Sequence, residues 1–223
     1  METNETTYPQ SGSFIDQAEL KSFYKSSLPQ ILKSVFGEPI NGTYRIFADQ
    51  SGKTYFQSLV LMASTFVLYV ILTYLLTGSQ LREIIGFGGA VKAGLGAVIF
   101  MLVVSVVVFG LKAVSGGKPQ FKNELMTGGL CSIPLIILLL LAFVAKMFAG
   151  EEAMSALTID PTSIIAKAGI MLLLMFYVLL MLINIVMQSL RASGTKDGWA
   201  WYMSPAVIFL SAYLSFKIAV GVL

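Results

Sequence analysis

The sequence contains no histidine, and its single cysteine, Cys131, lies within an apolar run. These two features exclude a zinc site built from cysteine and histidine, a disulfide bond within the chain, and any mechanism that needs an imidazole. The apolar segments also contain no HExxH motif and no pair of acids that would mark a catalytic centre. We therefore expect a protein without enzymatic activity, with no catalytic residue, no bound metal and no cofactor.

Charged residues are scarce as well, at 12% of the chain against 56% hydrophobic residues. Soluble domains are about 25% charged, so the composition indicates an integral membrane protein whose first partner is the lipid bilayer. The net charge of +3 is too small to indicate a nucleic-acid partner. The polar start, Met1–Gly12, does not have the pattern of a signal peptide. We expect the first apolar span to act as its own insertion signal.

The apolar residues are gathered into five runs, each near or above the roughly 20 residues that a membrane-spanning helix needs. The runs are Tyr55–Thr77, Gly88–Val114, Leu125–Phe148, Ile164–Leu190 and Trp199–Leu223. Because the polar joints between them are short, successive spans should be antiparallel neighbours. The predicted fold is an all-α polytopic membrane protein, a bundle of five transmembrane helices over residues 55–223.

The N-terminal region, residues 14–54, has the pattern of an amphipathic helical segment. Residues 1–13 are polar and are predicted to be a disordered tail. Apolar residues then recur every three or four positions, which predicts helices at about 16–26 and 28–37, with Pro29 in the first turn of the second. Residues 37–42 form a predicted turn. We expect these helices to lie on the membrane surface; the alternative is a small soluble helical cap.

The joint between the second and third spans, Ser115–Glu124, is short and basic, as cytoplasmic loops are. It and its flank supply a candidate partner-binding loop, Lys112, Lys118 and Lys122. The distribution of lysine and arginine, together with Trp199, Trp201 and Tyr202 at the inner interface, predicts a cytoplasmic N-terminus and an outer C-terminus.

A few polar residues lie within or near the spans and form a candidate intramembrane polar site: Lys92, Asn184, Gln188 and Lys217. The lysines can also reach the membrane surface by snorkelling, and the amides can hydrogen-bond a neighbouring helix. Pro134 is a candidate hinge, or a kink that serves packing. The small residues of Gly86–Ala97 suit either packing within the chain or contact between copies in an oligomer.

Two stretches resemble the bacterial members of the Yip family, the Rab/Ypt-interacting-protein-like membrane proteins. They are FYKSSLPQILKSVF near the N-terminus and GGKPQFKNELMTGGLCSIPLIILLLL at the second joint. The second stretch is similar to the family's basic loop of the form GG-K…F-K, after which Gly and Pro open the third span. The resemblance implies a five-helix bundle without enzymatic activity that acts in membrane organisation or as an adaptor, and a location in the bacterial inner (plasma) membrane. The tyrosine-rich motif of the eukaryotic members is not evident, and no site residue is fixed by the resemblance.

Two functions follow as hypotheses. The first is a membrane organiser or adaptor whose cytoplasmic face, formed by helix 16–37 and the loops Ser115–Glu124 and Arg191–Gly198, binds a protein partner. The alternative is a subunit of a transport or channel complex that handles a small solute or lipid. No acid lies in the middle of a span, and five spans leave no complete inverted repeat. Both features count against a self-sufficient transporter.

Overall fold

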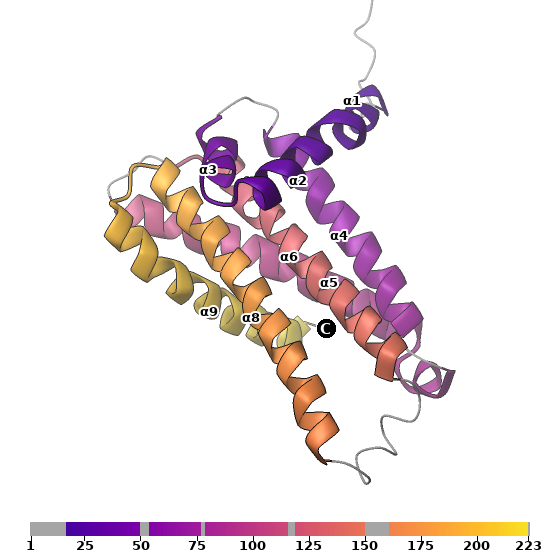
Figure 1. Cartoon of the computed structure of the whole chain (residues 1–223). Helices are drawn as coiled ribbons and strands as arrows, with labels where there is room; N and C mark the ends of the chain where they lie inside the picture. The colour runs from indigo at the N-terminus through magenta and orange to yellow at the C-terminus, as the bar shows by residue number, and fades with distance from the viewer. Residues whose placement is uncertain (1–16, 50–53, 77–78, 116–118, 150–160, 223) are drawn as a thin grey trace, which may run out of the picture.

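The structure is a computed structural model that describes residues 17–49, 54–76, 79–115, 119–149 and 161–222. Every regular element in these ranges is a helix, which confirms the all-α prediction. The elements are α1 (Gln17–Ser22), the π-helical turn η1 (Phe23–Ser27), α2 (Leu28–Gly37), α3 (Asn41–Ala48), α4 (Thr54–Leu76), α5 (Ser79–Val114), α6 (Phe121–Ala149), α8 (Pro161–Ala192) and α9 (Asp197–Val222) (Figure 1).

The five long helices α4, α5, α6, α8 and α9 are each long and apolar enough to cross a membrane. Their mean hydropathy runs from 1.6 for Asp197–Gly221 to 2.7 for Gly86–Val114. Large apolar side chains also face outward, as Leu173 does at 69% exposure. Outward apolar side chains are what a lipid solvent requires. The chain is therefore an integral membrane protein, and the predicted count of five spans is confirmed for the residues that the structure describes.

The bundle is built around α5 and α6 (Figure 1). Helix α4 packs against both of them on one side. On the other side α8 packs against α6, α9 packs against α5, and α8 and α9 contact each other. The fully buried side chains at the centre include Met101, Met126, Leu130 and Ile185. Because α6 touches α4, α5 and α8, and α5 touches α4, α6, α8 and α9, the packing of the bundle depends on these two helices.

A glycine pair in α6 lets its neighbours approach closely. A Cβ on Gly128 would collide with the Met101 carbonyl oxygen and the Ser105 hydroxyl of α5. A Cβ on Gly129 would lie 3.0 Å from the Ser58 Cα of α4. Small residues at such positions are the usual means of tight helix packing in membranes, where apolar side chains gain nothing by leaving lipid.

The small-residue patch of α5 packs within the chain. A Cβ on Gly94 would lie 2.9 Å from Val70 Cγ2 and 3.0 Å from Phe66 Cδ2, both of α4. Ala90 and Ala97, on the same helix, are buried. Packing within the chain, one of the two interpretations of this patch, is therefore what the structure shows at Gly94.

The predicted joints are shorter in the structure. Helix α5 begins at Ser79, so most of the expected joint Gly78–Phe87 is helical, and the break falls at Gly86, with φ 58° and ψ −175°. Helix α6 begins at Phe121, which places Glu124 in its first turn rather than in a loop. Polar residues do not end a helix by themselves. A helix can therefore extend beyond its apolar run, and the predicted loop boundaries were wrong for this reason.

The N-terminal helices form a cap on one end of the bundle (Figure 1). This helical cap comprises α1, η1, α2 and α3, residues 17–48. Proline stands in the first turn of α2, as predicted. The predicted turn, residues 37–42, is followed by a further short helix, α3, which begins at Asn41. Phe23, Ile31 and Val35 are buried in the same apolar core as the bundle, so the cap is packed on the membrane helices. The predicted tail, residues 1–13, lies outside the described residues.

We predict that Gly128→Ala destabilises the fold, because the added methyl group must displace the backbone of α5. Overpacking of this kind costs about 1–3 kcal/mol. Cys131 is the only cysteine and is fully buried, so a fluorogenic thiol reagent reports thermal unfolding in detergent. Gly96→Ala is the control, because a Cβ there meets nothing within 4 Å. Equal unfolding midpoints for the two variants would contradict the close approach of α5 to α6 at Gly128.

Candidate functional site at the capped end of the bundle

A buried ion pair joins α5 to α6. Lys112 lies in the last turn of α5 and Glu124 in the first turn of α6. The Lys112 Nζ atom lies 2.7 Å from Glu124 Oε2, and each side chain is only 7% exposed. A cation at a helix C-terminus and an anion at a helix N-terminus both interact favourably with the helix dipoles. The pair therefore closes the α5–α6 hairpin at its short connection.

Two hydroxyl groups complete this site. Lys112 Nζ also donates to Ser189 Oγ of α8 at 3.0 Å. The Thr127 and Ser189 hydroxyl oxygens lie 2.7 Å apart. We call Lys112, Glu124, Thr127 and Ser189 the Lys112 cluster. It connects α5, α6 and α8, and it satisfies the buried charges, whose desolvation would otherwise be costly.

A second polar network joins the cap to α8 and α9. Asn184 Nδ2 donates to the Pro39 carbonyl oxygen at 2.7 Å. Gln188 Nε2 donates to Asn184 Oδ1 at 3.1 Å, and Arg191 Nη1 donates to Gln188 Oε1 at 3.1 Å. Arg191 Nε in turn bonds Asp197 Oδ1 at 2.8 Å. This amide network, Pro39–Asn184–Gln188–Arg191–Asp197, runs along the last turns of α8.

The turn between α8 and α9 is fixed by its backbone. The Thr195 N–H donates to the Leu190 carbonyl at 3.2 Å, and the Gly194 N–H donates to the Arg191 carbonyl at 2.9 Å. These two bonds define a Schellman motif, which needs a residue with positive φ at the position of Gly194. Gly194 has φ 84°. The motif ends α8 sharply and sets the direction of α9.

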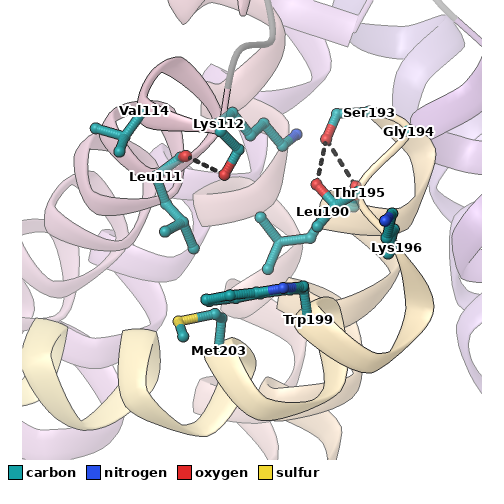
Figure 2. A pocket seen from close by; sticks show the side chains of 11 residues that line it. Leu111, Lys112, Val114, Leu190, Ser193, Gly194, Thr195, Lys196, Trp199 and Met203 are labelled. Atoms are coloured by element: carbon teal, nitrogen blue, oxygen red, sulfur yellow. Dashed lines mark hydrogen bonds between the residues drawn. The ribbon is translucent and has the colours of Figure 1, made fainter.

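An open pocket of about 540 Å³ lies where α5 ends, α8 ends and α9 begins (Figure 2). Figure 2 shows Trp199 and Met203 on one side of it and Lys112 with the Ser193–Lys196 turn on the other. Its lining residues are Leu111, Lys112, Val114, Ser115, Leu190, Ser193, Gly194, Thr195, Lys196, Trp199 and Met203. The pocket therefore combines cationic, hydroxyl, aliphatic and aromatic groups.

The structure separates the three lysines of the predicted partner-binding loop. Lys112 is buried, with 6% exposure, so it cannot present its charge on a loop surface as the sequence suggested. Its charge is used inside the bundle because Glu124 lies opposite it across the hairpin. Lys122 is exposed, with its Nζ 6.0 Å from the centre of the Tyr55 ring. Lys118 lies outside the described residues.

The four residues of the candidate intramembrane polar site do not meet in one place. Asn184 and Gln188 are bonded to each other, and Asn184 holds the cap, which fits the expectation of a hydrogen bond to a neighbouring element. Lys92 is exposed on α5. Lys217 is exposed on α9, 5.9 Å from the centre of the Tyr213 ring.

Pro134 is buried within α6, which continues as one helix on both sides of it. Its role as a hinge remains a prediction.

Sequence reasoning missed the Lys112–Glu124 pair and the part played by Ser189. The available signal was the placement of opposite charges at the facing ends of two consecutive spans. Among the residues that the structure describes, no group of three or more histidine, cysteine or acidic residues could hold a metal ion.

A scan against protein-family models, a search of curated proteins and a search of solved structures found no match to this chain. The resemblance to the Yip family is therefore neither supported nor contradicted by these comparisons.

We predict that Lys112→Met and Glu124→Gln each destabilise the bundle, the lysine change more strongly. Removal of one partner from a buried ion pair typically costs about 3–5 kcal/mol, because the other charge is left without compensation. In the double variant Lys112→Met/Glu124→Gln the loss should be smaller than the sum of the two single losses, because no buried charge is left without a partner. Thermal unfolding monitored at Cys131 measures all three, with the exposed Lys122→Met as the control. Additive losses in the double variant would show that the two side chains do not interact.

We also predict that Asn184→Leu loosens the cap, because the Pro39 carbonyl loses its donor. Hydrogen–deuterium exchange should increase in residues 28–48, while exchange in α5 and α6 stays unchanged. Leu173→Ala is the control, because this side chain lies on the same helix and is 69% exposed. Unchanged hydrogen–deuterium exchange in the cap of Asn184→Leu would show that the hydrogen bond from Asn184 to the Pro39 carbonyl does not hold the cap on the bundle.

Proposed function

We propose that the protein is a non-enzymatic membrane organiser or adaptor that binds a protein partner through its helical cap. The observation that carries this proposal is the exposed surface of the cap. The cap is packed on the bundle, and Phe36 and Ile40 line a pocket against Tyr177 of α8. The cap nevertheless keeps lysines and large apolar groups exposed: Lys25, Lys33, Phe36, Ile40 and Tyr44. We call these five residues the cap face. Aromatic groups that stay exposed next to charged ones are typical of binding surfaces.

The manner in which the cap is held supports this role. Phe23, Ile31 and Val35 are buried, the Tyr24 and Ser64 hydroxyl oxygens lie 2.6 Å apart, and Asn184 bonds Pro39. These contacts come from both sides of the bundle, α4 and α8. A surface fixed at both ends presents its side chains in a defined arrangement, which lowers the entropic cost of binding.

The buried polar groups at this end support a structural role over a catalytic one. Lys112 is engaged by Glu124 and Ser189. Asn184 and Gln188 are engaged in holding the cap. Groups that already satisfy one another stabilise a fold, whereas a catalytic group must be available to a substrate.

The charge at the capped end supports a cytoplasmic orientation. Exposed lysines are present on the cap, at the start of α6 and before α9: Lys21, Lys25, Lys33, Lys122 and Lys196. Cytoplasmic segments near membrane spans are enriched in such residues. The proposed partner therefore binds from the cytoplasm, with the C-terminus of the chain outside. The resemblance to the bacterial Yip family favours the inner membrane of a bacterial cell.

The alternative, a transport or channel subunit, relied on Asn184 and Lys217. Asn184 holds the cap, and Lys217 is exposed beside Tyr213 on α9. The two residues do not share a site, so the adaptor function is the better supported of the two.

The test is affinity capture from native membranes in a mild detergent, with quantitative mass spectrometry of what is retained. We expect a stoichiometric protein with the wild type and a loss of it with Lys25→Glu/Lys33→Glu, because charge reversal opposes the original attraction. Lys92→Glu is the matched control, since Lys92 is also exposed but lies on α5 outside the cap. Lys122→Glu shows whether the start of α6 contributes to binding of the partner.

Membrane insertion and the unfolding midpoint should be the same in all four proteins. Absence of a stoichiometric partner with the wild type, or equal loss in Lys92→Glu, would contradict the proposal.

A further inference from the structure

We propose that the pocket between α5, α8 and α9 binds the headgroup of an anionic phospholipid with one negative charge. This is a binding site beyond the adaptor function, on a different surface from the cap face. The proposal rests on the charge of the pocket, its hydrogen-bond donors and its position at the membrane interface.

The pocket has one cation in excess. Lys112 is neutralised by Glu124, and Arg191, behind the turn, is neutralised by Asp197. Lys196 is exposed and forms no ion pair within the described residues. One uncompensated cation matches the single charge of a phosphodiester. A zwitterionic headgroup would bring its own cation close to Lys196, at a cost in repulsion.

Donors for phosphate oxygens are present on two sides. The Lys112 ammonium has three N–H groups, of which Glu124 and Ser189 take two. On the other side, the first hydrogen bond of α9 runs from the Ala200 N–H to the Lys196 carbonyl. The N–H groups that precede it have no acceptor within the helix, and they carry the positive end of its dipole. The 26-residue α9 thus adds to the attraction that Lys196 exerts.

The apolar wall of the pocket indicates a lipid rather than a soluble anion. Leu111, Leu190 and Met203 line it together with Trp199, which is 59% exposed. Trp201 and Tyr202, the next aromatic residues of α9, are exposed at 62% and 75%. Tryptophan and tyrosine gather at the level of the headgroups. A phosphate in this pocket would therefore lie at headgroup depth, with aliphatic surface beside it for the start of an acyl chain.

Native mass spectrometry of the delipidated full chain in detergent tests the proposal. The probes are dioleoyl phosphatidylglycerol, dioleoyl phosphatidylcholine and soluble glycerol phosphate. We expect phosphatidylglycerol to bind more tightly than phosphatidylcholine and glycerol phosphate not to displace it. Lys196→Gln should weaken phosphatidylglycerol binding by about fivefold, the factor expected for one lysine near an anionic lipid surface. Trp199→Ala should also weaken it.

Matched controls separate this site from general attraction to lipid. Lys217→Gln and Trp201→Ala remove the same residue types at exposed positions outside the pocket, and they should leave binding unchanged. Equal binding of the two lipids, equal losses in the controls, or displacement by glycerol phosphate would each overturn the proposal. Lys196 and Trp199 are exposed, so their variants should keep the wild-type unfolding midpoint. Loss of lipid binding leaves the capture of a protein partner unaffected, so the two proposals fail separately.

Discussion

The buried pair of Lys112 and Glu124 is the interaction on which the capped end of the bundle depends. Two charges at the edge of an apolar bundle are stable only when each has a partner and the remaining donors are satisfied. Glu124 is the charged partner of Lys112, and Glu124 and the hydroxyl of Ser189 accept two of its three N–H groups. Because these residues come from α5, α6 and α8, satisfaction of one charge fixes the relative positions of three helix ends. The turn into α9 follows from this arrangement, since α8 ends directly after the cluster.

The same turn of α6 also provides the close packing of the bundle. Thr127 belongs to the Lys112 cluster, and the next two residues, Gly128 and Gly129, let α5 and α4 approach. In lipid there is no gain from burying apolar side chains against one another, so helices associate through close contact and hydrogen bonds. The structure places both kinds of interaction within one turn. A polar cluster and a tight packing site this close together support each other.

The sequence predicts the spans well because a backbone in lipid must satisfy its own hydrogen bonds. A long apolar run that enters the membrane therefore forms a helix. It predicts the joints poorly, since helices such as α5 and α6 continue into polar residues that hydropathy excludes. The Lys112–Glu124 pair was missed because counts of lysine and arginine treat each charge as solvated. Asn184 was recognised as a hydrogen-bonding residue, but its acceptor, the Pro39 carbonyl, lies 145 positions away along the chain. No local pattern could identify it.

The last turns of α8 explain why the cap face and the pocket occur at the same end. Neighbouring residues on this helix serve different partners: Gln188 belongs to the amide network that reaches the cap, and Ser189 belongs to the Lys112 cluster. Two residues later Arg191 bonds both Gln188 and Asp197, which opens α9 beside the pocket. Residues 184–191 of α8 thus position the cap on one side and the pocket on the other. A helix held by both networks can support a protein-binding surface and a lipid-binding surface without either one requiring the other to form.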